Sequence, residues 1–244
     1  MTTTPTPEER IAALESQVAA LERELQDFTY TVSHDLRAPL RHIVSFAKLV
    51  QMESADQLDA EAQGFLGNVV DSAALMGRML DGLLAISRVG AQELQWQDMA
   101  LAEVVQSCVQ TVQGRYPQHT VQWQAPAHLP VLRTDPALLQ QAVLALLDNA
   151  WKFTGGKADA AVTLALEQAD ARLRLRLQDN GAGFATQQVE RLGLPFVRLH
   201  SASQFDGVGL GLALARKCVQ RLGGRLQLEA TPAQGCCVTL ELPH

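Results

Sequence analysis

Apolar residues recur at heptad spacing in the first part of the chain. The steps alternate between three and four residues, and charged side chains fall off the seam, whose positions are Ile11, Leu14, Val18, Leu21, Leu25, Phe28 and Val32. A pattern kept over three heptads is typical of a coiled coil. It predicts a coiled-coil helix over residues 8–32, after a disordered lead of residues 1–7.

The seam changes its step near His34. Apolar residues follow at intervals of four up to Leu40, and the alternation then resumes. An extra residue in the heptad repeat locally unwinds a supercoil. Pro39 also has no backbone N–H to donate, so we expect the helix to be disturbed here. Ordinary irregularity of a helical bundle also explains the step, and the pattern alone favours that interpretation.

A second helix follows a polar turn at residues 51–62. It carries two adjacent apolar stripes, one of them made of Phe65, Val69, Ser72, Met76, Met79, Leu83 and Ile86. Two stripes are wider than a two-helix seam needs and suit a four-helix bundle. Since one hairpin supplies only two helices, the pattern predicts a homodimer.

From about Leu94 the pattern becomes mixed. A short segment at residues 94–99 leads into the first helical pattern. Alternating or apolar runs then indicate strands at residues 121–125, 131–133, 161–167, 172–178, 224–230 and 236–242. Helical patterns cover residues 101–115, 136–153 and 210–222. Such a mixture predicts a two-layer α/β sandwich with helices on one face of a mixed sheet. The fold class is therefore a helical hairpin followed by a separate α/β domain at residues 97–244, with the boundary at residues 91–97.

Composition narrows the function classes. The net charge of −6 argues against a nucleic-acid partner, because a duplex binder usually presents a basic face. The four cysteines form no C-x-x-C pair and are expected to be reduced thiols. No apolar run reaches membrane-spanning length and the start does not read as a signal peptide, so we expect a cytoplasmic protein without a membrane span.

Three weak signals for a phosphate-bearing ligand lie in the second domain. Asn149 offers the hard oxygen that suits Mg²⁺, and Lys152 lies on nearly the same helix face, within reach of a phosphate. Alone, such a pair at a helix end is more often a pair of solvated polar groups.

The other two signals are rich in glycine. Asp179 follows a strand and precedes Gly181 and Gly183, which suits either close approach to a ligand amino group or a hairpin turn. Gly207, Gly209 and Gly211 open a helix, where free N–H groups favour an anion, although small residues also allow tight packing. Neither a Walker loop nor a Rossmann fingerprint is present.

Taken in order, these motifs and the segment Ser33–Leu40 resemble the sensor histidine kinases. The histidine motif resembles residues 34–40, the asparagine motif residues 139–153, the two glycine motifs residues 179–184 and 207–211, and the phenylalanine motif residues 195–200. The resemblance runs from about Phe28 to the end of the chain. The amino-acid sequence around His34 and around Phe196 is similar to that of phytochrome-type kinases.

The resemblance implies a role for each motif. His34 would be the phosphoacceptor and Asp35 its orienting residue or general base. Asn149 would hold Mg²⁺, Asp179 would accept from the adenine of ATP, and Lys152 and Arg198 would contact the phosphates. Gly207, Gly209 and Gly211 would supply N–H groups, and residues 185–206 would form the lid over ATP.

It also implies partners and shows two departures. The partners are a response-regulator receiver domain and an upstream sensor domain or protein, for which residues 8–32 would be the signalling helix. Ala145 stands where the family often has a second metal-binding asparagine, which predicts a high Mg²⁺ requirement. Ala38 stands where many members have threonine or asparagine, which predicts weak phosphatase activity toward the regulator.

Other functions remain open at this point. Gyrase-like, mismatch-repair and chaperone ATPases share the nucleotide motifs but do not need His34 on a dimeric hairpin. A degenerate kinase would be a dimeric binding module without turnover, and Ala145 favours it while the intact Asp179 and Asn149 do not. A partner-switching serine kinase is disfavoured because it lacks the helical hairpin.

Overall fold

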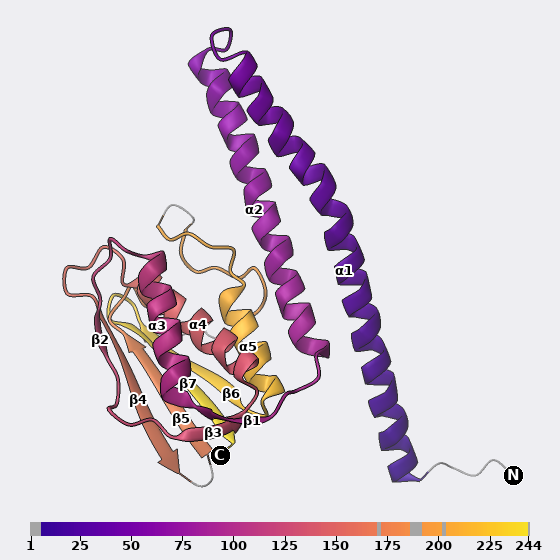
Figure 1. Cartoon of the computed structure of the whole chain (residues 1–244), viewed down its shortest axis with the longest axis vertical. Helices are drawn as coiled ribbons and strands as arrows, with labels where there is room; N and C mark the ends of the chain where they lie inside the picture. Colours follow the sequence, from indigo (N-terminus) through magenta and orange to yellow (C-terminus); the bar gives the residue numbers. More distant parts are fainter. Residues whose placement is uncertain (1–5, 170–171, 186–191, 202–203, 244) are drawn as a thin grey trace, which may run out of the picture. The chain divides into compact units, whose positions relative to one another are not determined.

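The computed structural model describes residues 6–169, 172–185, 192–201 and 204–243 (Figure 1). The chain divides into two compact units, with the division between Gln92 and Glu93. The first unit is a hairpin of two long helices, and the second contains a mixed sheet with helices over it. The predicted fold class of a helical hairpin followed by an α/β domain is therefore confirmed.

Helix α1 (Pro7–Glu53) begins with a complete capping box. The backbone N–H of Glu9 donates to the Thr6 hydroxyl at 3.2 Å, and the Thr6 N–H donates to the Glu9 carboxylate at 2.7 Å. This arrangement satisfies two of the N–H groups that a helix start leaves without partners. The helix already includes Pro7, so the N-terminal segment before it ends one residue earlier than the predicted residues 1–7. Its first five residues lie outside the described part.

Pro39 lies inside α1 without ending it. The disturbance expected near His34 is therefore not a break: helical backbone continues from Pro7 to Glu53. A proline removes one backbone hydrogen bond, which packing against a second helix can offset. The ion pair of Arg37 with Asp81 of α2, at 2.7 Å, joins the two helices just before the proline.

Helix α2 (Ala60–Ala91) starts earlier than the polar composition of residues 51–62 suggested. The carboxylate of Asp59 accepts the backbone N–H of Ala62 at 2.8 Å and so caps the helix. The predicted turn is consequently too long at both ends, because α1 also runs on to Glu53.

The predicted heptad seam of α1 is largely uncovered in the single chain. Between 55% and 65% of each residue is exposed at Ile11, Leu14, Val18, Leu21, Leu25 and Phe28. An apolar stripe of this length is unusual on a monomer and is typical of an interaction surface. The coiled coil over residues 8–32 stays a prediction, and the exposed seam is what a second helix would cover.

The second unit contains two sheets. Strands β1 (Gln97–Ala100) and β3 (Val131–Thr134) form an antiparallel pair. The larger sheet has the order β2-β4-β5-β7-β6 and is built from β2 (Gln122–Gln124), β4 (Ala161–Ala169), β5 (Arg172–Asp179), β6 (Arg225–Thr231) and β7 (Gly235–Pro243). Among its described strands, β2 and β4 pair in parallel and the other neighbours are antiparallel, which makes the sheet mixed as predicted.

Helices α3 (Leu101–Arg115), α4 (Pro136–Phe153) and α5 (Gly211–Arg221) lie over one face of this sheet (Figure 1). In β5, Leu173, Leu175 and Leu177 are buried toward the helices, as period-two alternation requires. Trp151 of α4 is fully buried and packs against Trp123 with ring centroids 5.7 Å apart. The four cysteines are free thiols, as expected.

Glu241 joins three strands on the opposite face of the sheet. Its carboxylate, whose side chain is only 4% exposed, accepts from Arg174 at 2.9 Å and from Arg225 at 2.8 Å, with Arg172 at 3.5 Å. The hydrogen bonds from Arg225 and Arg174 lower the pKa of Glu241. Because the folded pKa lies below the unfolded one, this stabilisation is complete above the unfolded value and is lost as the pH falls through the folded value.

We therefore expect Glu241→Gln to destabilise the second unit at neutral pH. The difference from the wild type should shrink as the pH falls through the lowered pKa of the wild-type carboxyl, because that group then becomes neutral as well. Urea unfolding followed by tryptophan fluorescence measures this, since all three tryptophans lie in the second unit. Glu229→Gln, at an exposed position of β6, is the matched control. A loss of stability that does not change with pH would contradict the assignment.

Candidate active site

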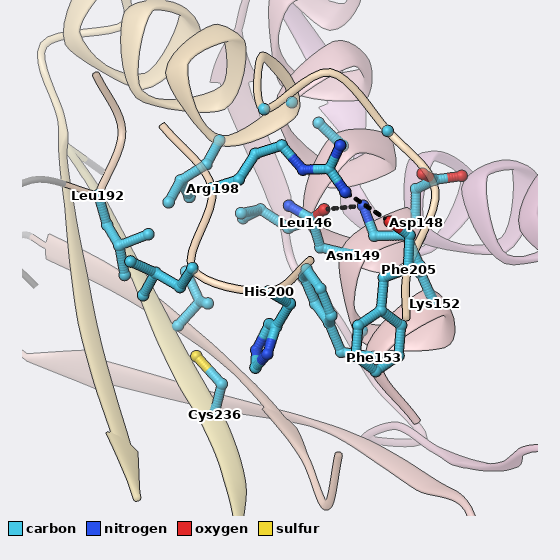
Figure 2. A pocket seen from close by; sticks show the side chains of 18 of the residues that line it. Leu146, Asp148, Asn149, Lys152, Phe153, Leu192, Arg198, His200, Phe205 and Cys236 are labelled. Atoms are coloured by element: carbon cyan, nitrogen blue, oxygen red, sulfur yellow. Dashed lines mark hydrogen bonds between the residues drawn. The ribbon is translucent and has the colours of Figure 1, made fainter. Parts of the chain in front are cut away.

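A pocket opens beside α4 and the sheet in the second unit (Figure 2). Its walls come from α4, from β5, β6 and β7, and from the segments on either side of the start of α5. Of the predicted site residues it brings together Asn149, Lys152, Asp179, Gly183, Arg198, Gly207, Gly209 and Gly211. Signals that are distant in the sequence therefore share one cavity.

Asp179 lies at the end of β5 and is only 5% exposed. Its carboxylate accepts the backbone N–H of Gly181 at 2.8 Å and that of Cys236 at 3.2 Å. Burial raises the pKa of this carboxyl, while the two N–H groups and the charge of Lys157 act in the opposite direction. The result is a rigidly held acceptor at the inner end of the pocket.

Two glycines allow the backbone to pack around Asp179. A Cβ on Gly181 would overlap the carbonyl oxygen of Phe153, and one on Gly235 would overlap the carbonyl oxygen of Asp179. Gly235 also has a φ of +99°, which residues with a side chain rarely adopt. Gly181 was predicted for the site and Gly235 was not. In the sequence, the one hint to a role for Gly235 is that it directly precedes the predicted strand at residues 236–242.

Asn149 and Lys152 lie on adjacent turns of one face of α4. The Lys152 ammonium donates to the Asn149 side-chain oxygen at 3.1 Å. Burial lowers the pKa of Lys152, and the charge of Arg198 lowers it further, against the opposing carboxylates of Asp148 and Asp206. Asp148 is engaged elsewhere, since Arg115 donates to it at 2.9 Å.

Arg198 and the glycine segment complete this end of the pocket. The side chains of Arg198, Asn149 and Lys152 converge there (Figure 2). The Gly209 carbonyl accepts the Phe196 N–H at 3.1 Å, which ties the segment to the residues before Arg198. Gly211 is the first residue of α5, and the start of a helix favours an anion. Positive charge and the start of a helix are thus concentrated at the end of the pocket away from Cys236 (Figure 2).

An aromatic cluster lines the same pocket, and two of its members, Phe153 and His200, end motifs named from the sequence, although their contact was not predicted. The ring centroids are 5.4 Å apart for Phe153 and His200, 5.0 Å for Phe153 and Phe205, and 5.2 Å for His200 and Phe205. These are normal separations for interacting aromatic rings. The predicted lid, residues 185–206, contains His200 and Phe205 but lies partly outside the described residues.

His34 lies on α1 in the first unit, and its side chain is 71% exposed. Its Nδ1 is 3.1 Å from the Asp35 carboxylate, and Tyr30 stacks on the ring with centroids 6.4 Å apart. In the tautomer whose Nδ1–H donates to this carboxylate, Nε2 carries the lone pair. This arrangement suits a nucleophile that must be reached by another domain.

Two family models match the chain. The His Kinase A (phospho-acceptor) domain matches residues 24–92, and the histidine kinase-, DNA gyrase B- and HSP90-like ATPase matches residues 134–244. The chain belongs to the sensor histidine kinases. The first model contains His34 and the second contains the whole described pocket, from Ala145 to Val238.

Curated relatives place this kinase near the phytochromes. It is 28% identical to phytochrome-like protein Cph1 of Synechocystis over 96% of the chain and 31% of that protein. It is 29% identical to the methanogenesis regulatory histidine kinase FilI of Methanothrix harundinacea over 97% of the chain and 26% of that protein. The chain therefore spans less than a third of the length of these relatives.

Solved structures agree with this fold. Full-length ShkA in complex with AMPPNP has a TM-score of 0.65 at 25% identity, over 89% of this chain and 45% of that one. The kinase ThkA in complex with the response regulator TrrA has a TM-score of 0.63 over 94% of this chain and 66% of that one; at 15% identity it shows the fold alone. No described helix of this kinase is long and apolar enough to span a bilayer.

Proposed function

We propose that this kinase transfers the γ-phosphoryl group of ATP to His34 and then to an aspartate of a response-regulator receiver domain. The observation that carries the proposal is the pocket, in which a buried carboxylate faces one end and two cationic side chains with a glycine segment face the other. An adenine nucleotide has this polarity, with an amino-bearing base at one end and phosphates at the other.

Each end of the pocket has a task in binding ATP. Asp179 accepts the exocyclic amino group of adenine, because its carboxylate is fixed by two N–H groups and retains acceptor capacity. Lys152 and Arg198 neutralise the phosphates, and the N–H groups around Gly207, Gly209 and Gly211 hold them. Since phosphoryl transfer has a loose transition state, such positioning accounts for most of the catalysis.

Asn149 fits the role of a Mg²⁺ ligand. Its side-chain oxygen lies in the pocket beside the phosphate-binding cations, and Mg²⁺ prefers such hard oxygens. The described residues contain no group of three His, Cys, Asp or Glu side chains that could hold a metal, so phosphate oxygens and water would complete the shell. A bound Mg²⁺ supplies neutralisation of charge that develops on the phosphates.

The chemical step uses the free nitrogen of His34. The Nδ1–H of His34 donates a hydrogen bond to the Asp35 carboxylate, so the lone pair of Nε2 attacks the γ-phosphorus while the bond from that phosphorus to the ADP oxygen breaks. The ring becomes positively charged as the N–P bond forms, and the Nδ1 proton then passes to the Asp35 carboxylate. ADP leaves with the electron pair of that bond, and the N–P bond of phosphohistidine takes its place. Asp35 orients the ring and stabilises its charge, as acidic partners of histidine do in other enzymes.

The exposed seam of α1 supports a homodimer. A second copy would cover the apolar residues from Ile11 to Phe28 and complete a four-helix bundle with the hairpin. We further propose that the kinase is cytoplasmic and receives its signal from an upstream sensor domain or protein, with residues 8–32 as the signalling helix. The response-regulator complex of ThkA supports the receiver domain as partner.

Incubation with γ-labelled ATP and Mg²⁺ tests the proposal. Acid-labile, alkali-stable label on the protein is the expected result, since phosphohistidine has this stability. Free phosphate without labelled protein would favour another ATPase of the family. ATP binding with neither product would favour a degenerate kinase that acts as a dimeric binding module.

Ala145→Asn is expected to lower the Mg²⁺ concentration needed for half-maximal autophosphorylation severalfold. The new side chain adds a second hard oxygen one helical turn before Asn149, inside the pocket that Ala145 already lines. Asp148 offers little compensation in the wild type because Arg115 holds its carboxylate. A Mg²⁺ titration of labelling measures the effect, and Ala145→Leu is the control of similar size without an oxygen. Saturation of the wild type at low Mg²⁺ would refute the expectation.

A further inference from the structure

His200 is the one member of the aromatic cluster that has both a stacking surface and polar atoms. It packs against Phe153 at the end of α4 and against Phe205, with centroid separations of 5.4 and 5.2 Å. Both phenylalanines also line the pocket. The three rings therefore form a continuous wall, in which His200 belongs to the described segment 192–201.

The nitrogens of His200 have no partner among the described residues. The rings of His34 and His119, by contrast, are each held by a side chain, at 3.1 Å in both cases. His200 is half-buried, so its ring is in contact with the pocket and remains open to it. A ring held by aromatic packing alone is free to face a ligand that offers another flat surface.

His200 lies nearer to one end of the pocket than to the other. In Figure 2 the ring lies toward Cys236 and away from the guanidinium of Arg198. Cys236 donates its backbone N–H to Asp179 at 3.2 Å, so this is the end that carries the buried carboxylate. His200 therefore lies at the base-binding end of the wall. Phe153 and Phe205 extend toward the phosphate-binding end, where the Lys152 ammonium lies 4.6 Å from the Phe153 ring centroid and Arg198 donates to the Phe205 carbonyl at 2.6 Å.

We propose that His200 is a nucleobase-binding residue, which packs its ring with Phe153 and Phe205 against the adenine held by Asp179. This inference rests on the proposed function and adds a contact from the segment before α5. Stacking of a base on an aromatic side chain contributes through the π-face and not through a particular nitrogen. A phenylalanine at this position should consequently serve as well as the histidine.

Binding of ATP and of inorganic triphosphate to the full chain tests the inference. His200→Ala is expected to weaken ATP binding roughly tenfold, as loss of one base–aromatic contact does. Triphosphate has no base, so its affinity should stay at the wild-type value. His200→Phe should keep the wild-type affinity for ATP, and this also shows that the segment still folds.

Several results would overturn the inference. Unchanged or tighter ATP binding by His200→Ala would show that the ring makes no contact with the base or competes with it. Equal weakening of ATP and triphosphate would indicate a structural role, and loss of affinity in His200→Phe would show that a nitrogen is needed. A wild-type chain that fails to bind ATP would overturn the proposed function as well, whereas the other results leave that function intact.

Discussion

Replacing His34 with alanine is expected to abolish acid-labile labelling by ATP and to leave ATP affinity unchanged. The imidazole lies on α1 in the hairpin unit, and the nucleotide pocket is built from residues of the other unit. Removing the nucleophile therefore eliminates the phosphoacceptor without changing a residue that lines the pocket. Gel labelling, paired with a direct measurement of ATP binding, checks both parts.

His42→Ala is the matched control for this experiment. His42 is another exposed histidine of the same helix, two turns further on, and should keep wild-type labelling. Persistent acid-labile label in the His34 variant would mean that another residue accepts the phosphoryl group. Label lost in both variants would point to damage of the hairpin and would not support His34.

Asp179→Asn is expected to weaken ATP binding roughly ten- to a hundredfold. The carboxylate is buried and accepts two backbone N–H groups, so its charge is held where it meets the ligand. Hydrogen bonds to a charged group are worth about 1.5–3 kcal/mol, and each 1.4 kcal/mol is a factor of ten in affinity. Calorimetric titration with ATP measures the loss.

A comparison with inosine triphosphate makes this test specific. Inosine carries an oxygen where adenine carries the amino group, so it gains nothing from the Asp179 carboxylate, and the substitution should affect it far less. Asp159→Asn, at an exposed carboxylate near the same edge of the sheet, is the control for removal of charge. An equal effect on both nucleotides would contradict recognition of the amino group.

The sequence predicted those features that depend on local pattern. Helix α4 was expected over its full range from the helical pattern at residues 136–153, and the structure adds the cap, in which Asp135 accepts the Leu138 N–H at 3.1 Å. The strands β4 and β5 were expected from alternation, and their mixed sheet follows. The turn between the long helices was predicted too long, since the cap at Asp59 was not recognised within a polar stretch.

Features that depend on packing between distant segments could not be predicted. The separate pairing of β1 with β3 could not be predicted, because residues 131–133 carry a strand pattern that does not specify the partner strand. Gly235 matters because its Cα approaches the Asp179 backbone, and His200 matters because Phe153 and Phe205 lie beside it. Such contacts arise only once the chain has folded. The roles of the individual site residues stay predictions that the experiments above address.

The uninterrupted course of α1 has a mechanical consequence. With 47 residues at about 1.5 Å each, it is a rod roughly 70 Å long. Torsion applied near Pro7 reaches His34 through continuous helix, and each residue inserted between them would rotate the imidazole by about 100° around the axis. Pro39 leaves the Asp35 carbonyl without its helical donor. The helix is therefore most easily bent within one turn of His34. A bend applied to α1 is expected to change the backbone most near this histidine.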